Sequence, residues 1–307
     1  MPVLLAGRHR LRLEAADPAV RDLACRLWST APEEAGGGPC FRLAVAVAEA
    51  AAGEDPEETL SWTVSDAETV LDAPGIALAV RPREGRASAS VARSLVISRP
   101  DLVTRLLLEA PVTAMKMARM QLLHAGAVVG PAGAAVIRGP AGAGKSTLVA
   151  ACRASGLGFL GDESLLVDRE SPDRLESTLR DLVLTPESSR LLGLDGASTP
   201  VLSGGERKRR LPLPEPRVPA DRLAVRVATV LLGPREPGPA RLEAVSGAPF
   251  LEAFAEGEIP QERMYDGAPE TIAHAWDGAG TWRLLGAVDL SGAVDRIRDL
   301  VHGITRR

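Results

Sequence analysis

The residues best suited to chemistry lie in one short run, Gly139-Pro140-Ala141-Gly142-Ala143-Gly144-Lys145-Ser146-Thr147. The run satisfies G-x-x-x-x-G-K-[ST], in which glycines of positive φ let successive backbone N–H groups point at phosphate oxygens. Lysine at this place supplies a mobile positive charge, and the following hydroxyl can ligate Mg²⁺. We therefore predict a nucleoside triphosphate site formed by Gly139, Ala141, Gly142, Ala143, Gly144, Lys145, Ser146 and Thr147.

The lysine of this run is unusual for the chain. Of 36 basic residues only three are lysine, namely Lys116, Lys145 and Lys208. Because the sequence otherwise uses arginine for its cations, a lysine at this place favours a phosphate-binding motif over a chance glycine-rich turn.

An acidic pair, Asp162-Glu163, follows Lys145 after only 17 residues, at the end of a predicted short strand. A helix and a return strand would bring a carboxylate back beside the phosphates. Such a carboxylate can share Mg²⁺ with Ser146 or take the proton of an attacking hydroxyl. Asp168 ends the next apolar run, at the far end of that strand, so we favour Asp162 for this role.

These features together resemble the catalytic core of the HPr kinase/phosphorylase family and its shorter relatives. The resemblance covers about residues 120–170 and includes Leu123-His124-Ala125, the following hairpin, the glycine-rich run and Phe159-Leu160-Gly161-Asp162-Glu163. It implies a P-loop kinase core with a mixed sheet that uses ATP and Mg²⁺ to phosphorylate a hydroxyl, typically of a serine. It also implies that Asp162 is the general base, that Glu163 is a second acidic group near the metal, and that His124 lies on the phosphate side. A homo-oligomer is compatible with it.

The sequence departs from the family pattern in two places. Glu163 stands where the family usually has aspartate, and residues 178–184 occupy the place of the family's E-I-R-G-L-G stretch without matching it. The acceptor is therefore left open among a small protein, a peptide and a small hydroxyl metabolite.

A basic stretch, Arg207-Lys208-Arg209-Arg210, lies in a predicted Gly-, Arg- and Pro-rich loop over residues 203–217. It could close over phosphates or dock an acidic acceptor, or it could be a solvated loop whose like charges repel. The preceding Leu202-Ser203-Gly204-Gly205-Glu206 is similar to the signature of ABC-type ATPases. The long apolar strand ending in Asp-Glu that those enzymes need is absent from the sequence, which argues against that class.

The elements that must position these residues are predicted from apolar patterning. In the first hundred residues, short strands are expected at 11–13, 60–64, 76–80, 87–91 and 95–97, a helix from Asp17 through Trp28, and either state at 44–52. Helical spacing follows over residues 102–122, with Pro111 breaking or kinking it and Met115, Met117 and Met120 in the core.

Further elements surround the glycine-rich run itself. Strands are predicted at 125–129, 134–138, 158–160, 164–167, 179–184, 223–232 and 282–290, with helices at 147–154 and at the carboxyl end. We therefore predict an α/β fold in which a β-rich region of unknown role, residues 1–105, precedes a catalytic domain, residues 106–307.

The composition and net charge of the chain argue against some classes of partner. Net charge −4 and 3% aromatic residues argue against a nucleic-acid binder. No apolar stretch approaches the length of a membrane span, and three cysteines without metal-ligand spacing suggest reduced thiols, so we expect a cytoplasmic protein.

The sequence thus predicts an ATP- and Mg²⁺-dependent kinase acting on an acceptor hydroxyl. Three alternatives stay open: a non-catalytic ATP sensor, simple ATP hydrolysis in an assembly, and pyrophosphate as the donor. The paired acidic residues favour the enzyme over the sensor, which needs only the phosphate-binding run and a metal.

Overall fold

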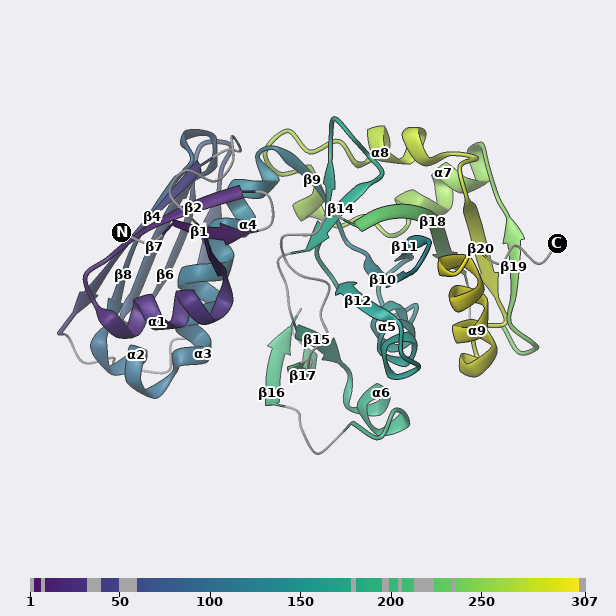
Figure 1. Cartoon of the computed structure of the whole chain (residues 1–307), viewed down its shortest axis with the longest axis horizontal. Coiled ribbons are helices and arrows are strands. Elements are labelled where there is room, and N and C mark those ends of the chain that lie inside the picture. Colours follow the sequence, from purple (N-terminus) through teal and green to yellow (C-terminus); the bar gives the residue numbers. More distant parts are fainter. Residues whose placement is uncertain are drawn as a thin grey trace. The chain divides into compact units, whose positions relative to one another are not determined.

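A computed structural model describes residues 3–6, 9–31, 40–49, 60–177, 181–194, 199–203, 206–212, 224–233 and 236–303. It is a mixed α/β protein with mixed sheets, divided into two compact units (Figure 1). Unit 1 consists of Met1–Met120 with Met264–Gly267, and unit 2 consists of Gln121–Arg263 with Ala268–Arg307.

Unit 1 is built on an eight-stranded sheet of order β3-β1-β2-β4-β8-β7-β6-β5. Its elements are β1 (Val3–Ala6), β2 (His9–Ala15), α1 (Pro18–Leu27), β3 (Ser29–Ala31), β4 (Cys40–Ala48), β5 (Ser61–Val64), β6 (Thr69–Ala73), β7 (Ile76–Arg81), η1 (Pro82–Glu84), β8 (Arg86–Ala92), α2 (Arg93–Ser98), α3 (Pro100–Val103), η2 (Thr104–Glu109) and α4 (Ala110–Met117).

Strands β2, β4 and β8 pair in parallel, and the remaining pairs are antiparallel. Buried and exposed residues alternate along β2, β4, β6, β7 and β8, which is the pattern of a sheet packed on one face only. Most strand predictions here are confirmed. The strand predicted at 95–97 is wrong, because Leu95 and Val96 are instead the buried side of helix α2.

The helical segment predicted over 102–122 forms α3, η2 and α4. A π-helical segment, η2, directly precedes Pro111, whose ring nitrogen has no hydrogen to donate to the preceding turn. Met115, Met117 and Met120 are buried as predicted. The segment packs on unit 1, so the change of unit falls after Met120, whereas the sequence suggested residue 105.

Unit 2 contains a nine-stranded sheet and a separate three-stranded sheet of order β15-β17-β16. Its elements are β9 (Met120–Leu123), β10 (Gly126–Gly130), β11 (Gly133–Arg138), α5 (Lys145–Ala154), β12 (Gly158–Gly161), β13 (Leu165–Asp168), β14 (Arg174–Ser177), β15 (Asp181–Leu184), α6 (Pro186–Leu191), β16 (Thr199–Ser203), β17 (Glu206–Pro212), β18 (Ala224–Leu232), β19 (Arg241–Ala244), α7 (Ala248–Ala255), η4 (Pro260–Arg263), α8 (Pro269–Trp276), β20 (Thr281–Leu285) and α9 (Leu290–Val301).

The larger sheet brings several carboxyl strand ends to one edge. Strand β10 is antiparallel to both β11 and β12, so β11 and β12 run the same way, and β18 and β20 are parallel to β11. The residues that follow β11, β12 and β18 therefore meet at this edge, which is the usual binding position in open α/β sheets.

Helices cover both faces of this sheet, as Figure 1 shows for α5 and α9 on one side and α7 and α8 on the other. Alternate residues of β11 pack into two hydrophobic cores, one on each face of the sheet. Ala135 and Ile137 pack with α5 and α9, while Ala134 and Val136 pack with α7 and α8. Burial on both faces fixes the position of the strand that leads into residues 139–147.

Two sequence predictions in unit 2 need correction. Residues 203–217 were expected to form a loop, but the described part pairs β16 with β17 as an antiparallel hairpin, with Ser203 opposite Glu206. The strand expected at 282–290 ends at Leu285, because Gly286 adopts a positive φ of 68° and turns the chain toward α9.

None of the helices described in the structure is long and apolar enough to cross a membrane.

Asp17 generates the first testable prediction, because it caps α1 as the sequence suggests. Its carboxylate accepts from the amides of Ala19 at 2.9 Å and Val20 at 3.3 Å. The same carboxylate pairs with the half-exposed Arg93 at 2.9 Å. We expect Asp17→Ala, which removes both the cap and this pair, to lower the free energy of unfolding by about 1 kcal/mol or more. Asp17→Asn should lose less, because it removes only the ion pair and its amide oxygen still caps the helix. Urea unfolding followed by circular dichroism measures this, and equal losses in both variants would contradict the cap.

Candidate functional site

Residues 139–147 form a tight loop between β11 and α5. Gly142 and Gly144 have φ values of 77° and 98°, in the left-handed region where a side chain is strained. The Ala143 amide donates to the Pro140 carbonyl at 3.2 Å, and α5 begins at Lys145 directly after Gly144. The free amides of the first helical turn therefore face the loop, which is the arrangement that binds anions.

Lys145 is buried, and its ammonium group is folded back on the loop. Its Nζ donates to the carbonyl oxygens of Gly139 at 2.8 Å and Pro140 at 3.1 Å. Burial lowers the pKa of Lys145, and the charge of Asp162 only partly opposes this. The Lys145 ammonium group therefore has too little negative charge around it. An anion bound in the loop would stabilise its charged form.

Asp162 follows β12 at the same sheet edge, next to Gly126 of β10. A Cβ added at Gly126 would lie 2.5 Å from a Val149 methyl group and 3.3 Å from an Asp162 carboxylate oxygen, so a side chain here would clash with Val149 and crowd the aspartate. Asp162 is 2% exposed, and neither of its oxygens has a well-formed hydrogen bond with any described residue.

The environment of Asp162 disfavours its charge. Burial, followed by the nearby charge of Glu163, raises its pKa to about 7 from an ordinary value of 3.8. The Ser146 hydroxyl and the Glu163 amide favour the ionised form, but without full hydrogen-bond geometry they do not offset the burial. An unsatisfied buried carboxylate beside a hydroxyl fits a divalent cation, with Ser146 and Asp162 as oxygen ligands.

Glu163 has a strained backbone, with φ at 62° for a non-glycine residue. Its carboxylate pairs with Lys208 of β17 at 3.3 Å. Of the basic stretch predicted to contact phosphates or acceptor, the structure describes the side chains of Lys208 and Arg209, and it is Lys208 that reaches the site. Arg207 and Arg210 lie on the same strand, but their side chains are outside the described part.

His124 lies half-buried where β9 gives way to β10. Burial, with the positive charges of Lys145 and Arg138, lowers its pKa to about 4. It is therefore neutral near pH 7 and can act as a hydrogen-bonding group beside the loop, but not as a cation.

A fully buried ion pair lies directly beneath the loop. The Arg138 guanidinium donates to both carboxylate oxygens of Glu262, at 3.0 and 2.9 Å, and to the Phe254 carbonyl at 2.8 Å. Glu262 also accepts from the His124 amide at 2.7 Å. The pair thereby joins the last residue before the loop, the residue that follows β9 and the η4 turn.

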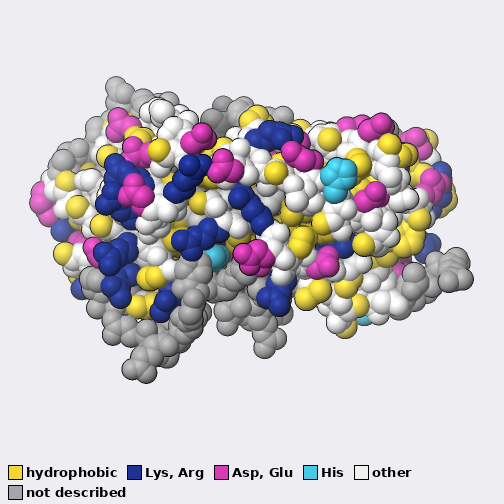
Figure 2. All heavy atoms as spheres, turned by 90° about the horizontal axis from the view of Figure 1, so that it is seen from above, with side chains coloured by type: hydrophobic (Ala, Val, Ile, Leu, Met, Phe, Trp, Pro, Cys, Tyr) yellow, Lys and Arg dark blue, Asp and Glu magenta, His cyan; other side chains and the backbone are white. Residues whose placement is uncertain are grey.

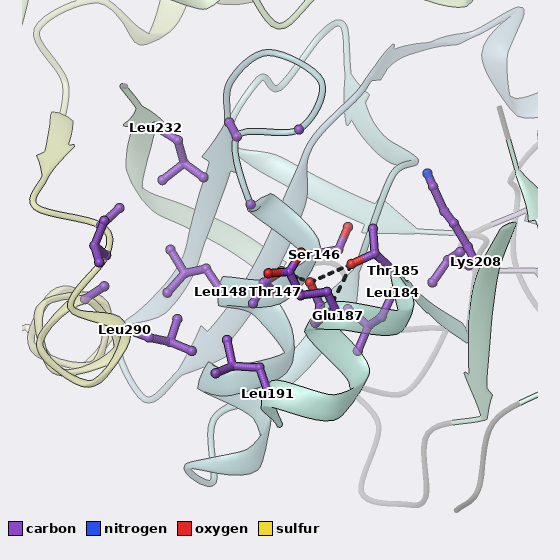
Figure 3. A pocket seen from close by; sticks show the side chains of 18 residues that line it. Ser146, Thr147, Leu148, Leu184, Thr185, Glu187, Leu191, Lys208, Leu232 and Leu290 are labelled. Carbon is purple, nitrogen blue, oxygen red and sulfur yellow. Dashed lines mark hydrogen bonds between the residues drawn. The ribbon is translucent and has the colours of Figure 1, made fainter. Parts of the chain in front are cut away.

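A pocket of about 400 Å³ opens beside the loop (Figure 3). One wall is made of hydroxyl groups, in which the Ser188 hydroxyl bonds to Thr147 at 2.7 Å and to Thr185 at 3.0 Å. The rest of the lining is largely aliphatic and comes from β15, α6, β18 and the segment that leads into α9: Leu184, Leu191, Leu232, Val288 and Leu290.

The sequence analysis named the loop, Asp162, Glu163 and His124, which the structure places near one another, but it did not name the pocket walls or the buried pair. Thr185-Pro186-Glu187 is a recognisable helix start and could have indicated α6. Nothing in the sequence connects Arg138 with Glu262, since strand pairing and packing bring them together.

No protein-family model matches this chain, and no curated protein matches its sequence. Within the described residues, no group of three or more His, Cys, Asp or Glu side chains is placed to hold a metal.

The raised pKa of Asp162 predicts a pH-dependent cost. Because the folded pKa lies above the unfolded value, stability contributed by this group is present below about pH 4 and is lost as pH rises through about 7. Without divalent cations, Asp162→Asn should therefore be more stable than the parent protein at pH 8, by about 1 kcal/mol or more. Urea unfolding with EDTA from about pH 4 to about pH 8, a range that includes both the unfolded and the folded pKa, measures this, and parallel curves for the two proteins would refute it.

Removing one partner of the buried pair should be costly. Glu262→Gln leaves the Arg138 guanidinium buried without a counter-charge, so we expect unfolding to become easier by about 3–5 kcal/mol. Glu258→Gln is the control, since Glu258 pairs with the half-exposed Arg263 nearby and should cost about 1 kcal/mol or less. Thermal and urea unfolding of both variants measure the contrast, and similar losses would show that the buried pair is not special.

Proposed function

We propose that this protein is an Mg²⁺-dependent phosphotransferase that moves the γ-phosphoryl group of ATP to an acceptor hydroxyl. The observation that carries the proposal is the buried, unsatisfied Asp162 carboxylate at the same sheet edge as residues 139–147. The resemblance of residues 120–170 to the HPr kinase type supports the same reaction and suggests a serine of a small protein or peptide, or a small hydroxyl metabolite.

The chain's own groups account for binding and orientation. Backbone amides of the loop and the amino end of α5 would hold the phosphates, and Lys145 would exchange two carbonyl partners for phosphate oxygens. Ser146 and Asp162, with Glu163 close by, would hold Mg²⁺. That ion, when bound, neutralises charge on the phosphates.

Asp162 would accept the proton of the acceptor hydroxyl. The acceptor oxygen would form a bond to the γ-phosphorus as the bond to the ADP oxygen breaks, and the hydroxyl proton would pass to the Asp162 carboxylate. A cation beside Ser146 would favour the ionised form of Asp162, and the ionised carboxylate is the form that can accept a proton. Most of the rate gain would come from positioning and electrostatics, because phosphoryl transfer needs little covalent help.

The lining of the pocket helps to distinguish between the two candidate phosphate donors, a nucleoside triphosphate and pyrophosphate. Its aliphatic walls next to the loop suit the flat apolar face of a nucleobase, whereas pyrophosphate would leave them empty. This favours a nucleoside triphosphate over pyrophosphate as the donor.

Two variants test the proposal. Lys145→Ala should lower turnover by about 10²-fold or more, since it removes the charge aimed at the transferring group. Asp162→Asn should keep ATP binding, measured by calorimetry, but lose about 10²–10⁴-fold in transfer. Radiolabelled γ-phosphate transfer to free serine and to serine-containing peptides measures turnover.

The same assay separates the rivals. A parent protein that binds ATP yet yields neither ADP nor phosphorylated acceptor would be a nucleotide sensor, and the proposal would fail. Loss of ATP–Mg²⁺ binding together with transfer in Asp162→Asn would assign the aspartate to the metal and not to the proton.

A further inference from the structure

One face of the sheet of unit 1 is covered by none of the helices that the structure describes, and we name it the bare face. The buried residues of β2, β4, β7 and β8 alternate with exposed or half-exposed ones, and the helices of the unit pack against the buried side. The other side therefore forms a surface of outward-pointing side chains.

The strand register places arginines in a row across this surface. Arg12 of β2 lies opposite Arg42 of β4, Arg42 lies opposite Arg86 of β8, and Arg86 lies opposite Arg81 of β7. Residues opposite each other in neighbouring strands point to the same face, with strands roughly 4.8 Å apart. Four guanidinium groups thus follow one another across four neighbouring strands, and we name them the arginine row.

Two of the four arginines in the arginine row pair with acidic side chains, and the other two have no ion-pair partner among the described residues. Arg81 pairs with Glu68 at 2.7 Å, and Arg86 pairs with Glu84 at 2.5 Å. Arg12 and Arg42 form no ion pair with any residue that the structure describes. Like charges set opposite each other destabilise a sheet, so this placement is not explained by the stability of the fold.

A flat floor of small side chains lies beside the arginine row. On β4, β8 and β7 the next positions on the bare face are Ala44, Ser88 and Ala79, which are opposite one another, followed by Ala46, Ser90 and Ala77. On β2 the corresponding position is Glu14, opposite Ala44, so the floor lies over β4, β8 and β7. Such short side chains let an extended chain lie close to the sheet while its own side chains reach the arginines.

We propose that this bare face binds an acidic peptide segment of a partner protein, with Asp or Glu carboxylates on the arginine row. Arginine suits this role because its planar donors match a carboxylate in pairs. Figure 2 shows Lys and Arg side chains gathered on unit 1, among acidic ones, in the view from above. None of the residues of the proposed surface belongs to the phosphotransfer site, so the two proposals stand or fall separately.

The floor favours a peptide over nucleic acid or a membrane. Bases of a single strand bind by stacking on aromatic rings, and no aromatic side chain stands among the described floor residues. Insertion into a membrane surface needs projecting apolar groups, whereas alanine and serine are short.

Binding of a fluorescein-labelled peptide of alternating Glu and Ala, about a dozen residues long, tests the proposal. Fluorescence anisotropy with the full chain and no nucleotide should show saturable binding. Arg12→Gln/Arg42→Gln should weaken it about tenfold or more, while thermal unfolding stays unchanged or improves, because the two charges repel. The matched control is Arg21→Gln/Arg26→Gln, which removes the same charge from exposed positions of α1 and should bind like the parent.

Equal weakening in the two double variants would reduce the effect to net charge and overturn the proposal. It would also be overturned if a Gln-Ala peptide bound as well as the Glu-Ala peptide. An oligothymidine that competed for the same arginines with higher affinity would assign the surface to nucleic acid instead.

Discussion

The candidate site depends on keeping one carboxylate out of water without giving it a partner. Asp162 is held by β12, whose last residue pairs with Ala127, and it is accommodated by the missing side chain of Gly126. Leaving a buried carboxylate unsatisfied is costly, and folded proteins retain such groups mainly where a ligand completes them. The strained backbone of Glu163 is a second local cost at the same turn.

The free-energy cost of the buried carboxylate and of the strained turn is offset by interactions in the structure beneath the site. Arg138 and Glu262 satisfy each other in full, and the guanidinium also lies 4.0 Å above the Phe254 ring. Because Glu262 accepts a hydrogen bond from the His124 amide as well, one carboxylate holds both the base of the loop and the residue that follows β9. A buried pair is not by itself a source of stability, but this one fixes the positions of two segments that the site needs together.

How much of this could be predicted from the sequence depends on how local each feature is. The β10–β11 hairpin, α5 and β12 are consecutive in the chain, and neighbouring residues determine their turns and caps, so these elements and the position of Asp162 directly after β12 could be predicted. The role of Asp162 stays a prediction. The run 95–97 was too short to show a period and was mistaken for a strand. The β16–β17 hairpin was missed because glycine, arginine and proline conceal its pairing. The arginine row arises from the register of strands distant in sequence, which no local pattern reveals.

The two charged groups at the site respond in opposite directions to what they would bind. Burial lowers the pKa of Lys145 and raises that of Asp162, so each is pushed toward its neutral form while the site is empty. A polyanion in the loop would restore the charge of the lysine, and a cation beside Ser146 would restore that of the aspartate. Each ligand also offsets the other's charge, because both approach the same buried edge. Binding of the polyanion and the cation should therefore be cooperative, because the full stabilisation of both charged groups is reached only when both ligands are bound.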